Sequence, residues 1–597
     1  MGYQFYIGLI IVVIATLYQW RPLVNRYDIL TEELNEEYDY IVIGGGTAGS
    51  VVASRLAEDV DKTVLLLEAG GHFTDNDMFF FPSGWGVIIG SEYDWKYVTE
   101  KQTTAAKGMR DNRFYFPRGK VLGGSGNMNG LQYTRGSKFD YDGWAADGCD
   151  GWSYKDVLPY FLKSEDIQID ELKSSPYHNI GGPIAVSYSA PSGLSDIFIK
   201  AGKELGYHEQ DYNGETMEGF SKVQSNIRNA ARSSSSIEYL GAKGRKDNLH
   251  ISVKSFVTKI DITDRTAKGV FFIKNDKKYY IKAAREVIVS AGAINSPQLL
   301  MLSGIGPEKE LEQHGIKVIQ DLPVGQYLKD HQLIVLPTAI NQSLSLKLGD
   351  LASSWTSWQY YLFKTGPLSM TTLDGSAFLY SDKSKRETSA PDLQVIFFNF
   401  LLTENLLGWA DSVANDLVKN FDSEYGFNSD LCLTHPYSHG TLTLRSDDPF
   451  DPPKINPNFF SDDRDIKTMI AGIRIWEKYI ETETMKALGV DINKRKLSAC
   501  AQYEFRSDDY WECYIRYTTN TEYHHSCTCR MGGLNDSLAV VDPELRVKGI
   551  TGLRVVDASV FHEVTAGNTN APTVMVAEKA ADMIRGKDTV AEYRDRV

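Results

Sequence analysis

Several features that mark specialised chains are missing from this sequence. Its 597 residues include only six cysteines, which excludes a small disulfide-stapled scaffold. No internal repeat, low-complexity tract or long block of like charge occurs. Basic residues are outnumbered 63 to 78 by acidic ones, and the net charge of −15 disfavours nucleic acid and anionic lipid as partners.

What remains is the composition of a globular protein. Hydrophobic residues make up 42%, aromatic residues 12% and charged residues 24% of the chain, which excludes disorder, collagen and coiled coil for its bulk. A chain of this length buries a sizeable core. One large bipartite enzyme fits the length as well as four small domains.

The N-terminus carries the longest apolar run, from Phe5 to Tyr18. It is shorter than the roughly 20 residues that a membrane-spanning helix needs, and it resembles the apolar core of a signal peptide. No basic residue precedes it and no A-x-A cleavage site follows it. If it is an anchor instead, Arg21 and Arg26 favour a cytosolic main body. A buried helix is the third alternative. We expect residues 1–30 to form a signal peptide, or else an anchor, and the protein to be secreted.

If the protein is secreted, it can form a disulfide and carry N-linked glycans. Cys500 and Cys513 are the best candidates for a disulfide, on spacing alone. Asn341 and Asn535 each begin an N-x-S sequon, which a secreted protein can carry as a glycosylation site. The sequence therefore predicts a glycoprotein with one disulfide if the chain is exported.

A strand–helix–strand unit follows the acidic linker after the N-terminal segment. Tyr40–Ile43 is a short apolar run typical of a buried strand, Ser50–Leu56 has a helical pattern, and Thr63–Leu67 is a second apolar run. Between the first strand and the helix stands Gly-Gly-Gly-Thr-Ala-Gly. This arrangement predicts a βαβ unit of about 30 residues.

The glycines of that turn match a dinucleotide-binding fingerprint. Gly44, Gly46 and Gly49 would allow a tight turn and let the backbone approach a pyrophosphate at the N-terminus of the helix. Glu68 ends the second strand about 20 residues later, where an acidic side chain accepts from a ribose hydroxyl. An ordinary glycine turn is the alternative. The fingerprint does not distinguish NAD from FAD.

Further strands are expected at Leu249–Val253, Val257–Ile262, Glu286–Val289 and 552–557, and a helix at 572–585. The middle of the chain, from about 345 to 520, is rich in aromatic residues and serine and mixes both periodicities. We interpret it as a second domain that covers the substrate.

Four longer motifs indicate which kind of dinucleotide-binding protein this is. They are Gly119–Gly130 (GKVLGGSGNMNG), Gly292–Gly306 (GAINSPQLLMLSGIG), His524–Gly532 (HHSCTCRMG) and Gly567–Thr573 (GNTNAPT). In this order, and together with the glycine fingerprint, they resemble the glucose–methanol–choline (GMC) oxidoreductases. The resemblance runs from about 37 to 587 and is greatest to the arthropod glucose-dehydrogenase-like branch.

The resemblance implies FAD rather than NAD, and an α/β fold (α+β overall). A Rossmann-like FAD-binding domain would be built from 37–140, 215–335 and 525–590. A substrate-binding domain on an antiparallel sheet would be built from 141–214 and 336–524.

It also implies which residues meet the cofactor. Thr47 and Ala48 would contact the diphosphate, Glu68 the adenosine ribose, and the Val257 backbone the adenine. At the isoalloxazine the family pattern places Val121, Asn129 and Gly130. Near the diphosphate and the flavin side chain it places Asp557 and Ala558, and Thr569 is a further expected cofactor contact. Some relatives attach FAD covalently through a histidine; Met128 stands at that position here, so we expect non-covalent FAD.

Alcohol oxidation needs a base for the hydroxyl proton and an acceptor for the hydride, which in this family is flavin N5. A neutral histidine within about 3 Å of the hydroxyl suits the first task. The family pattern places the base at His524 and its partner at Asn568. His525 is the alternative to His524, because only one of two neighbours in an extended segment can face the flavin. For Asn568 the alternative is a helix N-terminal residue without chemistry.

Other clusters are interpreted as structural. His524, His525, Cys527 and Cys529 lie close in sequence, but no second cluster completes a four-ligand zinc site, so we expect no metal. The histidines at the Asp330-His331 pair, His435 and His439 are expected to be satisfied turn or core residues.

The sequence thus predicts an FAD-dependent enzyme that oxidises a small alcohol. Electrons would pass to oxygen or to a quinone-type acceptor. The alternatives are a hydroxynitrile lyase or cyanohydrin (mandelonitrile-type) oxidase containing FAD, and a non-catalytic flavoprotein. Retention of both His524 and Asn568 argues against the last.

Overall fold

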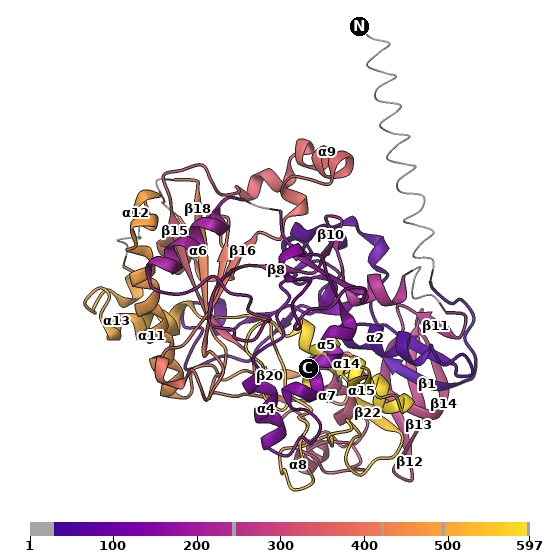
Figure 1. The fold of residues 1–597 in the computed structure, drawn as a ribbon. Helices are drawn as coiled ribbons and strands as arrows, with labels where there is room; N and C mark the ends of the chain where they lie inside the picture. The colour runs from indigo at the N-terminus through magenta and orange to yellow at the C-terminus, as the bar shows by residue number, and fades with distance from the viewer. Residues whose placement is uncertain are drawn as a thin grey trace.

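The computed structural model describes residues 29–190, 192–241, 246–419, 421, 423–490 and 496–593 (Figure 1). Nearly all of the expected signal peptide or anchor, residues 1–30, lies outside this part of the chain. Among the described residues, no helix is both long enough and apolar enough to cross a membrane.

The first sheet has seven strands in the order β11-β2-β1-β14-β13-β12, with β22 beside β14. Their bounds are β1 Glu37–Ile43, β2 Val64–Leu67, β11 Leu249–Ser252, β12 Phe256–Thr263, β13 Thr266–Lys274, β14 Lys277–Val289 and β22 Leu553–Val555. The strands β11, β2, β1, β14 and β22 pair in parallel. Parallel strands are covered on both faces, which explains the apolar runs that predicted β1 and β2.

Helix α2 (Thr47–Leu56) and helix α14 (Asn570–Arg585) pack against each other beside this sheet (Figure 1). The Arg55 guanidinium donates to the fully buried carboxylate of Glu578, with Nε–Oε2 and Nη2–Oε1 both at 2.8 Å. At the N-terminal ends of the helices, Thr47 Oγ1 donates to Asn570 Oδ1 at 3.2 Å. Two segments far apart in the sequence therefore meet where the glycine turn lies.

The second sheet has six strands in the order β21-β15-β18-β17-β16-β7, all antiparallel. Their bounds are β7 Gly219–Lys222, β15 Gln332–Ala339, β16 Leu373–Leu379, β17 Leu393–Phe398, β18 Gly426–Leu433 and β21 Asn520–Thr521. The expected second domain on an antiparallel sheet is confirmed. The domain limits stay a prediction, and β7 joins this sheet although it falls within 215–335.

Helices α6 (Leu194–Glu204), α11 (Asp463–Ile480) and α13 (Asp508–Thr518) pack on the second sheet (Figure 1). The other α-helices are α3 Trp85–Ile88, α4 Lys138–Ala146, α5 Tyr154–Ser164, α7 Gly292–Leu302, α8 Glu308–Gln313, α9 Ser354–Phe363, α10 Asp411–Leu417, α12 Glu483–Ala487 and α15 Thr589–Glu592. Short strands form small separate sheets: β3 Tyr97–Val98 with β4 Tyr115–Phe116, β5 Glu165–Ile167 with β6 Ile184–Tyr188 and β8 Gln224–Ser225, β9 Ile227–Arg228 with β10 Ala231–Arg232, and β19 Thr441–Thr443 with β20 Lys454–Asn456.

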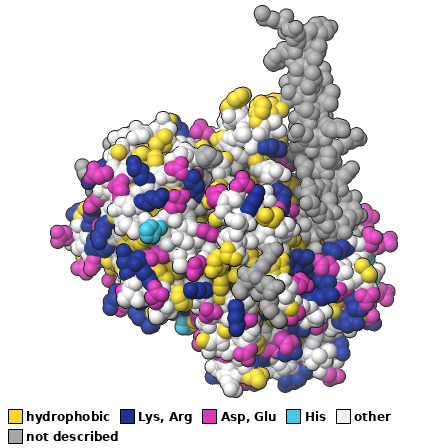
Figure 2. All heavy atoms as spheres, viewed as in Figure 1, with side chains coloured by type: hydrophobic (Ala, Val, Ile, Leu, Met, Phe, Trp, Pro, Cys, Tyr) yellow, Lys and Arg dark blue, Asp and Glu magenta, His cyan; other side chains and the backbone are white. Residues whose placement is uncertain are grey.

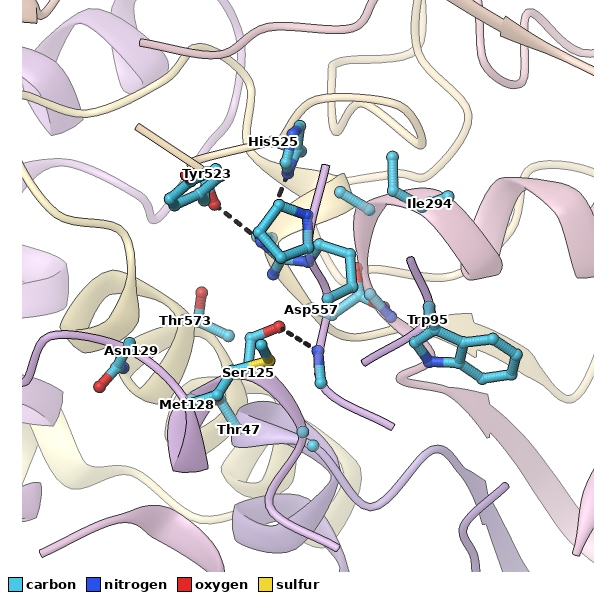
Figure 3. Close-up of a pocket in the computed structure, with 18 of the residues that line it drawn as sticks. Thr47, Trp95, Ser125, Met128, Asn129, Ile294, Tyr523, His525, Asp557 and Thr573 are labelled. Atoms are coloured by element: carbon cyan, nitrogen blue, oxygen red, sulfur yellow. Dashed lines mark hydrogen bonds between the residues drawn. The ribbon is translucent and has the colours of Figure 1, made fainter. Parts of the chain in front are cut away.

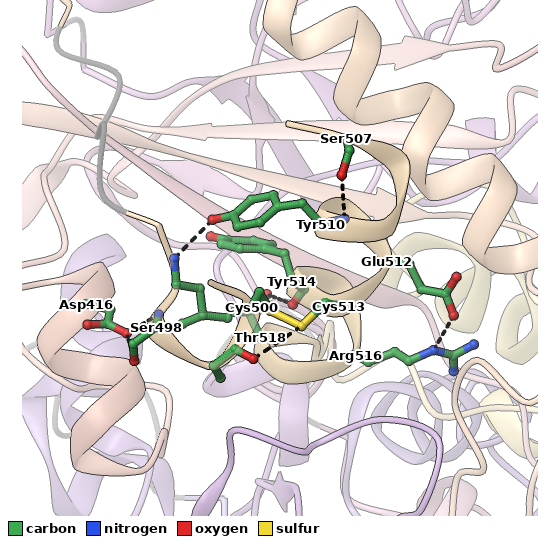
Figure 4. The surroundings of a disulfide bond; sticks show 12 residues. Asp416, Ser498, Cys500, Ser507, Tyr510, Glu512, Cys513, Tyr514, Arg516 and Thr518 are labelled. Carbon is green, nitrogen blue, oxygen red and sulfur yellow. Dashed lines mark hydrogen bonds and ion pairs between the residues drawn. A yellow bond between two sulfur atoms is a disulfide. The ribbon is translucent and has the colours of Figure 1, made fainter. Parts of the chain in front are cut away.

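The expected disulfide is present. Cys500 and Cys513 are bonded, with their Cα atoms 5.9 Å apart, and link a short 3₁₀ turn to α13 (Figure 4). From α13, the Tyr514 hydroxyl donates to the Val335 carbonyl of β15 at 3.1 Å. The disulfide thus helps to hold α13 against the second sheet. The other four cysteines are buried free thiols.

The surface mixes charges of both signs. Figure 2 shows basic and acidic side chains interspersed over the visible face, with no large area of one sign. Both sequon residues, Asn341 and Asn535, are exposed.

Candidate active site

A single cavity reaches from the carboxyl ends of β1 and β2 to the second sheet (Figure 3). Its volume is about 330 Å³, which lies within the roughly 300–1,000 Å³ of a common small-ligand site.

The first glycine turn shapes one end of this cavity. Gly44 has a φ of +95°, and a Cβ there would lie 2.5 Å from the Ser290 carbonyl oxygen. A Cβ on Gly49 would lie only 1.9 Å from the Gly44 oxygen, so Gly49 lets helix α2 pack close to the turn. Gly46 differs, because its Cβ would meet no protein atom nearer than 3.9 Å and would project towards the cavity. A pyrophosphate can occupy that space against bare backbone.

The N-terminus of α2 faces the same space without a side-chain cap. Thr47 and Ala48, in its first turn, line the cavity. Uncapped N–H groups and the helix dipole favour an anion there. This end of the cavity therefore fits a diphosphate.

Glu68 lies beside the turn. Its carboxylate accepts from the backbone N–H of Gly45 at 2.8 Å and of Gly70 at 2.7 Å. Burial raises the pKa of Glu68 to about 7, although these hydrogen bonds oppose the shift. A carboxyl group has further lone pairs, so Glu68 can still accept from a ribose hydroxyl.

A second glycine turn presents Asn129 to the cavity. The Asn129 Oδ1 atom accepts from Leu131 N at 3.1 Å and from Arg232 Nη1 at 2.8 Å. Since both donors hold the oxygen, the amide NH₂ is left to face a ligand. Arg232 is itself buried, its pKa is lowered to about 9 by burial, and its Nε and Nη2 atoms have no hydrogen-bond partner in the described structure.

Asp557 is fixed by three donors. Its Oδ2 accepts from Gly292 N at 2.8 Å and Ser296 Oγ at 2.6 Å, and its Oδ1 accepts from Ser559 N at 2.8 Å. The carboxylate ties the start of α7 to the segment after β22. Asp557 and Ala558 both line the cavity.

Most residues expected to bind the cofactor line this cavity, namely Gly44, Gly46, Thr47, Ala48, Glu68, Asn129, Gly130, Val257, Asp557, Ala558 and Thr569. Gly49 and Val121 do not line it. Gly49 acts in packing, as described above. Val121 is fully buried, and its carbonyl accepts from Gly124 N at 2.7 Å, so it supports the second glycine turn from behind.

At the opposite end, the structure brings His524 and Asn568 together. The Asn568 Nδ2 atom lies 3.4 Å from His524 Nε2, and both residues line the cavity. The Asn568 Oδ1 atom accepts from Gln394 Nε2 at 3.3 Å and from Thr134 Oγ1 at 3.5 Å. These donors orient the amide so that its NH₂ faces His524.

On its other side His524 meets His331, with 2.8 Å between the two Nδ1 atoms. One of them must donate. If Asn568 donates to Nε2, the network assigns the His524 proton to Nδ1 and its lone pair to Nε2. The basic nitrogen then faces the cavity.

These histidines are held neutral. The pKa of His524 is lowered well below its ordinary value by burial, then by its electrostatic coupling to His331 and His525, and then by the positive charge of Arg118. Burial lowers the pKa of His331 to about 3. A neutral imidazole at physiological pH is the form that can accept a proton.

His525 also lines the cavity, contrary to the expectation that only one of the two neighbours can do so. The segment is not a regular strand, because Tyr523 has a φ of +63°. The Arg118 guanidinium donates to His525 Nδ1 at 3.3 Å, and Phe116 packs on the ring with 4.0 Å between centroids. The Arg118 guanidinium also donates to the Tyr523 carbonyl oxygen at 2.7 Å, and both Tyr523 and His525 are drawn at the cavity in Figure 3.

Asp330 holds this segment in place. It accepts from His524 N at 2.8 Å and from the Thr521 hydroxyl, and His525 Nε2 lies 3.4 Å from its Oδ2. The Asp330-His331 pair was interpreted from the sequence as structural, yet His331 touches His524. The adjacency of Asp330 and His331 in the sequence was the available signal, but only strand pairing shows where they point.

His435 and Cys527, which were interpreted from the sequence as structural residues, lie in buried or partly buried contacts. His435 Nε2 pairs with Asp140 Oδ1 at 2.7 Å. Burial raises the pKa of the Cys527 thiol. Within the described residues no group of three or more metal-ligating side chains converges.

Comparison with known proteins agrees with this geometry. Family models described as GMC oxidoreductase match residues 38–333 and 436–577. The chain belongs to the GMC oxidoreductase family. It is an FAD-dependent oxidoreductase of alcohols, and the glycine turns and uncapped helix fit that cofactor.

Two relatives illustrate the range of this family. The chain is 41% identical to "Glucose dehydrogenase [FAD, quinone]" of Drosophila pseudoobscura pseudoobscura over 564 residues, covering 93% of this chain and 87% of the relative. It is 37% identical to "Alcohol dehydrogenase [acceptor]" of Pseudomonas putida, covering 93% and 97%.

Solved structures of the GMC fold match over almost the whole chain. A formate oxidase from Aspergillus oryzae gives a TM-score of 0.81 at 29% identity, covering 95% of this chain and all of that one. Pyridoxine 4-oxidase from Mesorbium loti gives 0.78 at 27% identity, covering 92% and 99%.

Proposed function

We propose that this GMC oxidoreductase oxidises the CH–OH group of a small alcohol, with His524 as the base. The observation that carries the proposal is the pair formed by His524 Nε2 and Asn568 Nδ2, 3.4 Å apart at the cavity wall. FAD, when bound, supplies the hydride acceptor.

In this proposal the substrate hydroxyl lies between the two side chains. His524 Nε2 accepts the hydroxyl proton, and His331 fixes the imidazole from behind through Nδ1. The Asn568 NH₂ donates to the substrate oxygen as negative charge develops on it. Gln394 and Thr134 keep that amide oriented.

For the cofactor we propose non-covalent binding at the glycine-turn end. Thr47 and Ala48 would hold the diphosphate, Glu68 the ribose, and Asn129 the ring system. Met128 lines the cavity where some relatives carry the histidine that bonds to the flavin. A thioether does not form that bond, so acid or denaturant should release FAD intact.

We propose secretion as well, with residues 1–30 as signal peptide. The Cys500–Cys513 disulfide and the exposed sequons at Asn341 and Asn535 support it, because disulfides persist in oxidising compartments. An N-terminal sequence of the exported protein checks the cleavage.

The test of the reaction is an anaerobic titration of the purified protein with a panel of alcohols, followed by admission of air. Bleaching of the yellow absorption at roughly 450 nm identifies the alcohols that are oxidised. Fast recovery in air indicates an oxidase; slow recovery that a quinone accelerates indicates a dehydrogenase. A yellow protein that no alcohol bleaches would contradict the proposal and favour the lyase alternative.

A further inference from the structure

Two carboxyl groups line the cavity and have no role in the chemistry described so far. Asp430 lies on β18, and Glu522 follows β21 two residues before His524. Both are partly exposed where they line the cavity. Neither belongs to the cofactor end.

The strand register places Asp430 on the cavity face of the second sheet. Asn520, Leu333, Cys432 and Gln394 are successive partners across four strands. Directly opposed residues point the same way, and Gln394 of this row touches Asn568. Asp430 stands two residues from Cys432 and therefore faces the same side.

These carboxyl groups lack a cationic partner. Within the described residues, neither Asp430 nor Glu522 takes part in a salt bridge, and the Asp430 carboxyl has no hydrogen bond to another residue. Glu522 Oε2 accepts only a weak contact from Cys432 Sγ at 3.7 Å. Asp330 is different, since Thr521 and His524 N use its oxygens. Asp430 and Glu522 thus have hydrogen-bonding capacity left for a ligand.

The surroundings keep both groups uncharged. Burial raises the pKa of Asp430 to about 8. Burial, and then the negative charges of Asp430 and Asp330, raise the pKa of Glu522 well above its ordinary value. A protonated carboxyl both donates and accepts a hydrogen bond, as an alcohol hydroxyl does.

We propose that Asp430 and Glu522 recognise a second hydroxyl group of a polyhydroxylated substrate, remote from the hydroxyl that His524 deprotonates. This inference rests on the proposed function. The neighbouring Asn520 amide adds a further donor and acceptor to the same corner of the cavity. Leu333, Leu373 and Phe398 supply the apolar remainder of the wall.

The same corner disfavours other substrates. An anion would meet two carboxyl groups, neither of which is paired with a cation among the residues that the structure describes. A simple hydrocarbon alcohol would leave the carboxyl groups buried without a partner, which is costly. A cationic amino alcohol would need the carboxyl groups to ionise against their burial.

A matched pair of substrates tests the proposal on the FAD-loaded wild-type protein. D-Glucose and tetrahydropyran-2-ol share the ring and the reacting hydroxyl, and only glucose has the others. Since a site built for hydroxyl groups rejects analogues that lack them, kcat/KM should favour glucose at least about a hundredfold. A second pair, sorbitol and 1-hexanol, extends the comparison to open chains.

Variants test whether Asp430 and Glu522 cause the preference for glucose. Asp430→Leu and Glu522→Met should each lower the ratio of kcat/KM for glucose to that for tetrahydropyran-2-ol at least about tenfold, mainly by raising the KM for glucose. Asp430→Asn and Glu522→Gln retain a donor and an acceptor and should keep the ratio within about fivefold. Asp374→Asn is the matched control, because Asp374 is a buried carboxyl of β16 that does not line the cavity.

The outcomes separate the two proposals. If no alcohol of either kind bleaches the flavin, the proposed function fails. If monoalcohols are oxidised as well as polyols by wild-type protein, or if choline is preferred to both, the inference fails while the function stands. Retained flavin absorbance and an unchanged Tm show that each variant is folded.

Discussion

The two ends of the cavity differ in whether backbone groups or side chains form the binding site. The cofactor end is mostly backbone: glycine turns, the uncapped start of α2 and N–H groups that hold Glu68. The substrate end is made of side chains. Histidines, carboxyl groups and amides meet there from β18, β21, the segment after β21 and the segment before α14.

This difference predicts different sensitivities. Binding at the cofactor end should survive most substitutions of nearby side chains, but not a Cβ added where two backbone segments touch. At the substrate end, loss of one polar side chain or a change in its protonation should impair the reaction, because each polar group is held by a partner side chain. The following predictions test whether the two ends respond in these ways.

The largest effect should follow His524→Ala. The variant should fold and bind FAD, because His524 lies at the substrate end, but should lose turnover by about 10²–10⁴-fold, the usual scale for a lost acid–base group. Stopped-flow bleaching of the flavin by an alcohol measures it. His525→Ala is the control, since the Arg118 and Phe116 contacts indicate a packing role. Wild-type turnover in His524→Ala, or equal losses in both variants, would overturn the assignment.

Gly49→Ala should break the cofactor end. Its Cβ would lie 1.9 Å from the Gly44 oxygen, so α2 must move away from the turn. We expect a loss of about 3 kcal/mol in the free energy of unfolding, and protein that is purified without yellow colour. Gly46→Ala has room for its Cβ and should stay folded while it binds FAD more weakly. Equal stability of Gly49→Ala and wild type in urea denaturation would contradict the close packing.

Acid should destabilise the substrate end through its histidines. His331 has a folded pKa of about 3 and an unfolded value near 6.5, so its contribution is fully present above pH 6.5 and is lost as pH falls towards 3. At pH 5 the loss from this one residue is about 2 kcal/mol. His331→Gln should therefore show a smaller difference between its Tm at pH 7.5 and at pH 5 than wild type. An identical pH dependence would show that His331 can be protonated in the folded protein.

Asn568→Ala should have the smallest effect of the four, about tenfold on the rate of flavin reduction, because one hydrogen bond to the substrate oxygen is removed. KM should change little. Asn568→Asp is a useful companion, since it keeps the size but not the NH₂. An unchanged reduction rate in Asn568→Ala would remove Asn568 from the reaction.

The contrast between the ends also explains what could be predicted from the sequence. The glycine turn, α2 and β2 are contiguous, so the pattern from Tyr40 to Glu68 was enough to predict the unit. Cys500 and Cys513 are close in sequence, and their pairing was predicted from spacing alone.

The substrate end could not be derived in this way. His331 and His524 are 193 positions apart, and Gln394 and Asn568 are 174 apart, so their contacts follow from the pairing of β15, β17 and β18. A one-residue change of register would turn Asp430 away from the cavity. The positive φ of Tyr523, which shows that the segment with both histidines is not a regular strand, has no marker in the sequence.

The cofactor end has one further consequence, which concerns synthesis on the ribosome. Its first half, β1 and α2, is made early, but Asn570, which contacts Thr47, and Glu578, which pairs with Arg55, belong to α14. The roughly 510 residues between β1 and β22 take roughly 25–100 s to translate. During that time the apolar face of α2 lacks its partner helix and the FAD site is incomplete. This topology therefore places the completion of the FAD site after the synthesis of α14.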